Sequence, residues 1–208
     1  MANGVPALEM IGLERLRELE PNARAVQALY SPQTAIVDYS AVSAAMAKNL
    51  EQRGATVQIG TAVRGARRAD GLTYLETTRG VVATRHLINC AGLYADTIAR
   101  LLGAKPDVQI IPFRGEYYTL RHDQKLIRSL IYPVPDPEFP FLGVHFTKRI
   151  QGDYEAGPNA VLAFAREGYR MRNIRPDELL GTLAYRGFWA MAQRYWRMGS
   201  YEMYRSLS

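Results

Sequence analysis

The sequence predicts an α/β (α+β) fold in two parts, in which helices and short strands precede a part richer in β structure. Glycines separate β-like runs between residues 56 and 84. A strand-like run, a glycine and a helical run follow in that order around Gly92, which is the layout of a βα turn. From Lys105 onward, prolines interrupt short aromatic runs, and this pattern favours strands joined by rigid turns.

Composition places the chain among ordinary soluble globular proteins. Of its 208 residues, 48% are hydrophobic and 22% are charged, which excludes a disordered chain, a collagen-like fibre and a charge-rich coiled coil. The single cysteine, Cys90, excludes an internal disulfide and a Cys-rich zinc site. A reducing, cytoplasmic location is therefore expected. We find neither the roughly eighteen apolar residues of a membrane span nor a secretory signal.

The first half predicts two helices. Apolar residues at helical spacing predict a helix over 11–19 that ends before Pro21. Asp38 and Ser40 are candidate N-caps for a helix over 41–53, with Met46 and Leu50 facing inward and Gly54 ending it. Three strands are expected next, over 56–59, 72–78 and 81–84.

The βα turn is the most informative local pattern. Residues 86–91 form a short apolar run, Gly92 interrupts it, and 93–102 have a helical pattern. A ligand could approach the backbone at Gly92, because glycine has no Cβ and a helix N-terminus favours anionic groups. A plain βα turn that needs a small residue is the alternative interpretation, and this feature alone favours it.

A second, mostly β layer is expected to begin near residue 106. Aromatic runs such as 116–118 and 139–141 supply the strands. Pro176, Asp177 and Glu178 then predict the start of a helical tail. One face of this tail carries apolar side chains, with two tryptophans seven positions apart beside it: Phe188, Met191, Tyr195, Met198, Trp189 and Trp196.

The tail also carries most of the positive charge. Residues 166–208 hold eight Arg against four acids, which is +4 of the total of +6. Stacking on nucleic acid is one interpretation of this basic aromatic segment, and docking on an anionic membrane surface is another. Apolar residues at helical spacing favour a third, in which the rings are core and the Arg side chains are solvated.

Motif spacing excludes several kinds of site. No two of the seventeen glycines are separated by a single residue, so the dinucleotide fingerprint G-x-G-x-x-G is absent. A G-x-S-x-G nucleophile elbow and a phosphate-binding P-loop are absent too. The three histidines, His86, His122 and His145, are far apart and form no metal-binding helix motif. No metal site is expected.

Several blocks of the sequence resemble one enzyme family. The turn at 89–96 is similar to the second flavin-contacting βα turn of the D-amino-acid-oxidase-like, FAD-dependent oxidoreductases. More specific blocks resemble the branch of that family that oxidises L-2-hydroxyglutarate. They are 3–6, 20–21, 31–39, 112–118, 132–137, 139–147 and 157–164. The similarity extends to about residue 170.

The resemblance implies oxidation of L-2-hydroxyglutarate to 2-oxoglutarate by hydride transfer to FAD. It further implies a partial FAD-binding, Rossmann-like domain over 31–105, a substrate-domain helix region over 1–30, and a β-rich substrate domain over 106–208. Since the fingerprint is absent, we expect a central portion of the enzyme that is inactive alone. Oxidation of another 2-hydroxy or 2-amino acid in the same family is an alternative, as is a non-catalytic basic module. The expected partners are a small dicarboxylate 2-hydroxy acid and a peripheral membrane or quinone contact, at the inner membrane, without nucleic acid.

Site residues follow from the matched blocks. His145 is the candidate base, with a satisfied core histidine as the alternative. Arg114 is the candidate carboxylate clamp, unless it pairs with Glu116 or another acid. The donors that could orient the substrate are Tyr118, Tyr132 and Asn159. The positions that resemble backbone contacts to the cofactor are Val63 for the adenine, and Ala91 and Gly92 for the pyrophosphate or ribityl side.

Overall fold

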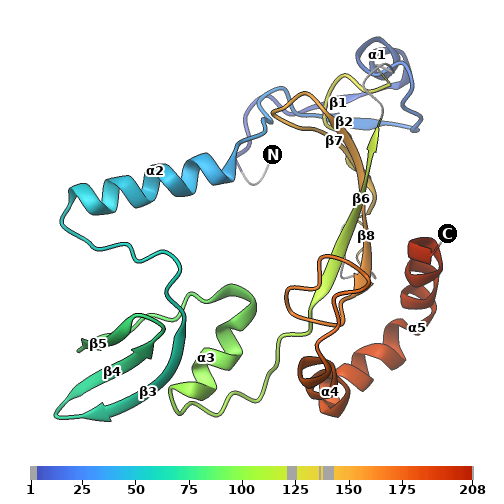
Figure 1. Cartoon of the computed structure of the whole chain (residues 1–208). Coiled ribbons are helices and arrows are strands. Elements are labelled where there is room, and N and C mark those ends of the chain that lie inside the picture. Colours follow the sequence, from blue (N-terminus) through green and yellow to red (C-terminus); the bar gives the residue numbers. More distant parts are fainter. Residues whose placement is uncertain (1–3, 121–125, 136, 138–142, 208) are drawn as a thin grey trace. The chain divides into compact units, whose positions relative to one another are not determined.

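The computed structural model describes residues 4–120, 126–135, 137 and 143–207 and confirms a mixed α and β class (Figure 1). The chain divides into two compact units that interleave in sequence. The first unit combines Met1–Asn49 with Gly115–Asn159, and the second combines Leu50–Arg114 with Ala160–Ser208. The functional division at residues 30 and 105 stays a prediction.

The first unit begins with a small hairpin and a helix. Strands β1 (Glu9–Ile11) and β2 (Ala28–Tyr30) pair antiparallel, and α1 spans Leu13–Leu19 between them. The prediction that this helix includes Ile11 is wrong, because Ile11 pairs with Ala28 in the hairpin. Glu20, at the C-terminal end of α1, is buried, and its carboxylate accepts hydrogen bonds from the backbone of Arg128 and Ser129. This carboxylate joins two segments that are distant in sequence.

Helix α2 (Tyr39–Gln52) confirms the second predicted helix. The Asp38 carboxylate accepts hydrogen bonds from the backbone N–H groups of Ser40 and Ala41, at 2.9 and 3.2 Å, so Asp38 is the N-cap. The expectation that Met46 and Leu50 face inward is wrong, since both are exposed. The helix is rich in alanine and contains no buried residue, so local propensity and the cap support it more than packing does.

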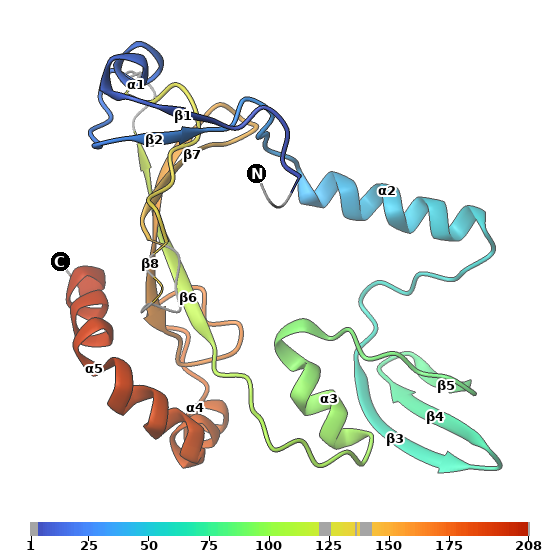
Figure 2. The ribbon, with the colours of Figure 1, turned by 180° about the vertical axis from the view of Figure 1, so that it is seen from behind.

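The second unit contains an antiparallel sheet in the order β3-β4-β5 (Figure 2). Its strands are β3 (Val63–Ala69), β4 (Leu72–Thr77) and β5 (Gly80–Thr84). The last two confirm the prediction. The strand expected at 56–59 is wrong, because the paired segment begins at Val63 instead. Asp70 and Gly71, both with positive φ, form the tight β3–β4 turn that sets this register.

The βα turn is partly as predicted. A 3₁₀ turn η1 (Gly92–Tyr94) leads into α3 (Ala95–Leu101), so the helical run is confirmed. The strand expected at 86–91 is wrong, since these residues are described without strand structure. The side chain of Asn89 makes the hydrogen bonds here, at the end of this run, with the backbone N–H of Ala91 and the carbonyl of Ala95.

A further sheet confirms β structure after residue 106. It has the order β6-β8-β7, from β6 (Phe113–Leu120), β7 (His145–Lys148) and β8 (Tyr154–Leu162). Strands β7 and β8 are antiparallel, with His145 opposite Gly157. The aromatic run at 139–141 and His122 lie outside the described residues.

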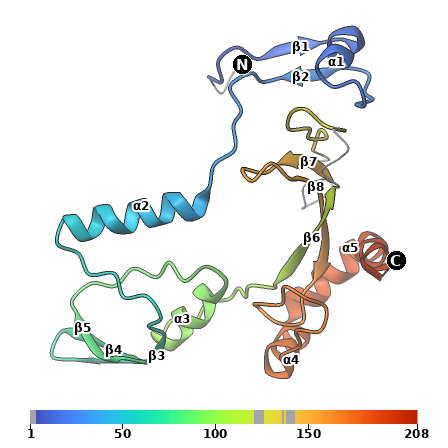
Figure 3. The ribbon, with the colours of Figure 1, turned by 45° about the horizontal axis from the view of Figure 1, so that its top comes forward.

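The helical tail predicted from Pro176 is confirmed, and it consists of two helices at the end of the second unit (Figure 3). They are α4 (Pro176–Ala184), with proline in its first turn, and α5 (Arg186–Leu207), kinked at Tyr195. Phe188 is buried, but the interpretation that the rings of this tail are core is wrong for Trp189 and Trp196, which are exposed. In the part of the chain that the structure describes, no helix combines the length and hydrophobicity of a membrane span. The buried apolar side chains of this unit are Val161, Ala163, Ala165 and Phe188.

Candidate functional site

His145, the candidate base, lies at the centre of an aromatic cluster in the first unit. It is the first residue of β7 and is 7% exposed. The Tyr132 ring stacks on its imidazole with 4.6 Å between centroids and 22° between planes. Tyr117, from β6, presents its ring to the imidazole at 6.1 Å and 71°. The two rings restrict the orientation of the imidazole.

The hydrogen bond of His145 defines which ring nitrogen can accept a proton. Its Nδ1 atom lies 3.1 Å from the Gly143 carbonyl oxygen. A carbonyl oxygen can only accept a hydrogen bond, so Nδ1 carries a hydrogen atom and its N–H group donates to Gly143. In the neutral ring, Nε2 is then the basic nitrogen. This tautomer is the one that a general base on the Nε2 side requires.

Gly157, opposite His145, is closely packed by Tyr117. A Cβ at Gly157 would lie 2.6 Å from Tyr117 Cδ1 and 2.7 Å from the Glu116 carbonyl oxygen. Only glycine allows this approach. Loss of hydration raises the pKa of Tyr117, and the nearby Glu155 carboxylate raises it further. The tyrosine therefore stays protonated at neutral pH and keeps its hydroxyl as a donor.

Two of the predicted donors have different surroundings. Asn159, in β8, is 4% exposed, and its Nδ2 donates to the Glu116 carboxylate at 3.2 Å. Tyr118 is 62% exposed on β6. In the first unit the structure therefore joins His145 with Tyr132, fixes Asn159 on Glu116, and leaves the Tyr118 ring open to solvent.

Arg114 belongs to the second unit and is buried there. Its Nη1 donates to the Gly168 carbonyl oxygen at 3.3 Å, and its Nη2 lies 3.5 Å from the Met171 sulfur. These contacts connect the start of β6 to the loop that follows β8. Arg114 therefore stabilises the loop that follows β8.

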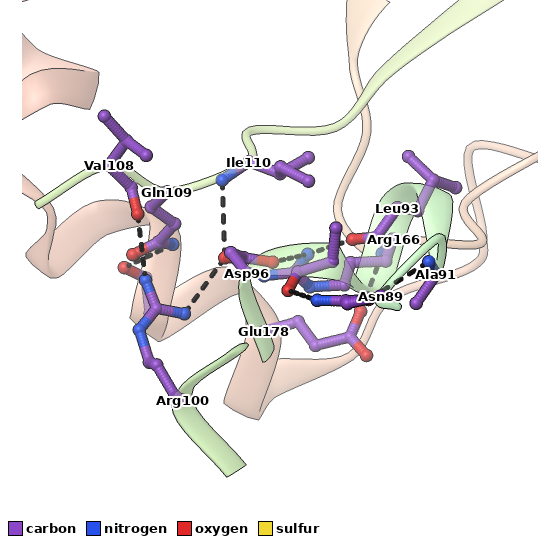
Figure 4. Close-up of polar contacts among 12 residues, drawn as sticks. Asn89, Ala91, Leu93, Asp96, Arg100, Val108, Gln109, Ile110, Arg166 and Glu178 are labelled. Carbon is purple, nitrogen blue, oxygen red and sulfur yellow. Dashed lines mark hydrogen bonds and ion pairs between the residues drawn. The ribbon is translucent and has the colours of Figure 1, made fainter. Parts of the chain in front are cut away.

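The predicted cofactor positions also lie in the second unit. Val63 is half-buried at the start of β3 and pairs with Thr77. Gly92 has a φ of +53°, and a Cβ there would meet no atom within 4 Å. The Asn89 amide accepts from the Ala91 N–H at 3.2 Å and donates to the Ala95 carbonyl at 2.8 Å (Figure 4). The side chain thus closes the turn and leaves the space beside Gly92 open.

Asp96, beside this turn, holds a buried network of charged hydrogen bonds (Figure 4). Its carboxylate accepts from Arg166 at 2.7 and 2.9 Å, from Arg100 at 3.0 Å and from the Ile110 N–H at 3.4 Å. Burial by itself would raise the pKa of Asp96, but the hydrogen bonds from Arg166 and Arg100 outweigh it and hold that pKa well below its usual range. The carboxylate is therefore ionised at neutral pH.

The sequence reasoning missed several of these residues. Asp96 and Arg166 are 70 positions apart, and no local pattern relates them. Tyr117 lies inside a block that carries the family resemblance, so its aromatic character next to the candidate Tyr118 is the signal that could have identified it. Within the described ranges, no three His, Cys, Asp or Glu side chains gather into a group that could hold a metal ion.

Comparisons with known proteins identify the family of the chain. The model of the FAD dependent oxidoreductase family DAO matches residues 1–196. The chain is 44% identical over its whole length to L-2-hydroxyglutarate dehydrogenase of Indibacter alkaliphilus, of which it covers 53%. It is 41% identical, over 99% of its length, to the mitochondrial L-2-hydroxyglutarate dehydrogenase of Caenorhabditis elegans, of which it covers 49%. The chain thus spans about half the length of the curated relatives it matches.

A solved structure shares the fold. The L-proline dehydrogenase from P. horikoshii superposes with a TM-score of 0.62 at 18% identity, over 97% of this chain and 48% of that chain. An identity this low carries the fold alone.

Proposed function

The chain belongs to the DAO family of FAD-dependent oxidoreductases, and we propose that it forms part of an enzyme that oxidises L-2-hydroxyglutarate to 2-oxoglutarate. The observation that carries this proposal is the 44% identity, along the whole chain, to a protein named for that substrate. The reaction removes a hydride from C2 of the substrate and a proton from its hydroxyl group. FAD, when bound, supplies the hydride acceptor. The protein must hold two carboxylates and accept the proton.

The turn at Gly92 fits a flavin cofactor. Its positive φ and the open space on its Cβ side allow a ligand to reach the backbone. The Asn89 side chain holds the turn from within. We assign Ala91 and Gly92 to the pyrophosphate or ribityl side and the backbone of Val63 to the adenine, within a flavin-binding part over 31–105.

His145 is the proposed base. Because its Nδ1–H donates to Gly143, the neutral imidazole presents Nε2 to accept the hydroxyl proton of the substrate. The stacked ring of Tyr132 keeps the imidazole in place.

Charged and polar side chains are proposed for the substrate carboxylates. Arg114 supplies the planar donor fork that a carboxylate prefers. Tyr118, Tyr132 and Asn159 supply neutral donors. The exposure of Tyr118 and Tyr132 supports a role at a surface that receives the ligand. The hydrogen bond from Asn159 to Glu116 supports an orienting role for Asn159. These residues lie in the proposed β-rich substrate domain, 106–208. Residues 1–30 are proposed to form the helix region of the same domain.

The experiment compares substrates in the flavin-loaded protein that contains this chain. Under anaerobic conditions, L-2-hydroxyglutarate is expected to bleach the yellow flavin absorption and to yield 2-oxoglutarate, while the D-enantiomer does neither. Bleaching by a different 2-hydroxy or 2-amino acid, with no response to L-2-hydroxyglutarate, would assign the chain to another substrate of the same family. A protein that takes up no flavin would contradict the whole proposal.

A second role, contact with an anionic membrane surface, is supported by helix α5. Five large side chains on it are more than half exposed: Trp189, Trp196, Tyr201, Tyr204 and Leu207. Arginines lie beside two of these rings, Arg197 at 5.4 Å from the centre of Trp196 and Arg205 at 5.8 Å from that of Tyr201. Amphipathic helices of this composition lie at membrane interfaces. Such a contact would also bring the flavin enzyme close to a membrane quinone.

Vesicle binding tests this role. The chain is expected to sediment with anionic lipid vesicles in low salt, and the double variant Arg194→Glu/Arg197→Glu is expected to stay in the supernatant. The matched control is Arg64→Glu/Arg68→Glu, which makes the same charge change on exposed positions of β3. If both variants lose vesicle binding equally, the binding depends only on net charge. If the chain binds DNA but not the vesicles, a nucleic-acid role is favoured instead.

A further inference from the structure

We propose that Arg166 is a positioning residue for the turn that carries Ala91 and Gly92. The inference rests on the proposed function, because these two residues are its flavin contacts. Arg166 lies in the loop between β8 and α4, 70 positions from Asp96. It therefore connects the end of the proposed substrate sheet to the proposed flavin turn through side-chain contacts within the second unit.

The Arg166 guanidinium holds three acceptors at this turn (Figure 4). Its Nη1 and Nη2 atoms lie 2.7 and 2.9 Å from the two carboxylate oxygens of Asp96. Nη1 also donates to the Leu93 carbonyl. A guanidinium has enough N–H groups in one plane to serve all three acceptors, which an ammonium group cannot do with the same geometry. The side chain is 11% exposed, so solvent screens these bonds little.

The clamp is itself fixed. The backbone N–H of Arg166 donates to the Glu178 carboxylate in α4, at 2.6 Å. The adjacent Glu167 accepts a hydrogen bond from the Tyr94 hydroxyl at 3.0 Å, and the Arg166 guanidinium lies 5.8 Å from the centre of the Tyr94 ring. Two consecutive residues thus contact η1 at Leu93 and Tyr94.

Local bonds alone do not attach the turn to the rest of the second unit. Asn89 closes the turn from within, and the Tyr94 N–H donates to the Ala91 carbonyl. Arg166 adds the bond to Leu93, the residue directly after Gly92, and anchors it to α4 through Glu178. Arg100 also binds Asp96, but its second bond goes to the Val108 carbonyl. Arg166 is therefore suited to fix the orientation of the peptide groups that face the cofactor.

Amide hydrogen exchange of this chain without cofactor tests the clamp directly. In Arg166→Met, the amides of Ala91 and Tyr94 are expected to exchange about tenfold faster, because charged hydrogen bonds of this kind are lost. Protection of β3–β5 is expected to stay unchanged. The matched control Arg100→Met removes the other guanidinium from Asp96 and spares Leu93, so its effect on the turn is expected to be smaller. Arg166→Lys keeps the charge, and the exchange rates of its turn amides are expected to lie between those of Arg166→Met and Arg100→Met. This variant covers the case in which Arg166→Met fails to fold.

FAD affinity separates positioning from a merely structural role. In the flavin-loaded protein that contains this chain, Arg166→Met and Arg166→Lys are expected to raise the FAD dissociation constant about tenfold or more. Unchanged turn exchange in both variants, or an equal effect of Arg100→Met, would overturn the proposal, as would a loosened turn with unchanged FAD affinity. Failure of the unaltered protein to take up FAD would contradict the proposed function, while faster turn exchange in the Arg166 variants would still support the clamp.

Discussion

The imidazole of His145 stacks on the phenol ring of Tyr132, with 4.6 Å between their centroids. Gly157, which pairs with His145 across the two strands, leaves room for the Tyr117 ring. The candidate base is thus enclosed by aromatic side chains from β6 and from the loop before β7. The rings restrict the orientation of the imidazole, and the hydrogen bond to the Gly143 carbonyl fixes its tautomer.

Removing the Tyr132 ring is expected to impair the base. Tyr132→Leu abolishes the stack, which contributes about 0.5–1.5 kcal/mol, and should lower the turnover number. Tyr132→Phe retains the ring and removes only the hydroxyl, so it should raise the Michaelis constant if that hydroxyl binds substrate. Steady-state kinetics of the two variants in the flavin-loaded enzyme separate these effects. Identical kinetic constants for Tyr132→Leu and Tyr132→Phe would show that the stacked ring does not support the base.

Gly157→Ala is expected to destabilise the first unit. The new Cβ would clash with the Tyr117 ring and with the Glu116 carbonyl, and overpacking of this kind costs about 1–3 kcal/mol. Urea unfolding measures the change in free energy. Gly199→Ala is the control, since a Cβ there meets nothing within 4 Å and alanine favours a helix. Equal stability of the two variants would contradict the packing described.

Arg114→Lys tests the carboxylate clamp. Lysine cannot donate in a planar fork, so the Michaelis constant for L-2-hydroxyglutarate is expected to rise more than the turnover number falls. Loss of the bond to Gly168 should also lower stability, by about 1–3 kcal/mol. If stability alone changes, Arg114 acts only on the loop after β8.

Asp96→Asn is expected to be destabilising at neutral pH and progressively less so in acid. The pKa of Asp96 is lowered in the folded state, so its ionised carboxylate stabilises the fold above the unfolded pKa of about 3.9 and loses this contribution as the pH falls below it. Leaving Arg166 without its buried partner costs about 3 kcal/mol at pH 7. Urea unfolding from neutral pH down to about pH 3 should show the difference shrinking. A difference that is constant with pH would contradict the charged network.

Local signals were sufficient for much of the fold. Asp38 and Pro176 mark helix starts, and Gly71 and Gly80 mark the turns that precede β4 and β5, because caps and turns depend on the residue that occupies them. The sequence pattern did not predict strand β3, because Arg64, Arg67 and Arg68 interrupt the alternation of apolar and polar residues that is typical of a strand. An exposed strand face nevertheless tolerates charged side chains. The run at 86–91 is apolar like a strand, yet side-chain bonds from Asn89 shape its end.

The candidate site was predictable only in part. His145 and Tyr132 are candidates because each lies in a specific block, but the contact between their rings comes only from the fold. Asp96 and Arg166 illustrate the same limit, since a charged pair 70 positions apart leaves no periodic pattern in the sequence. Contacts of this kind depend on tertiary structure.

We propose that His145 accepts the substrate proton in a flavin-dependent oxidation of L-2-hydroxyglutarate. The most direct measurement is the anaerobic rate of flavin reduction by L-2-hydroxyglutarate in the flavin-loaded enzyme and its His145→Ala variant. We expect a rate at least about 100-fold lower in the variant, with unchanged flavin content. An unchanged rate of flavin reduction in the variant would contradict it.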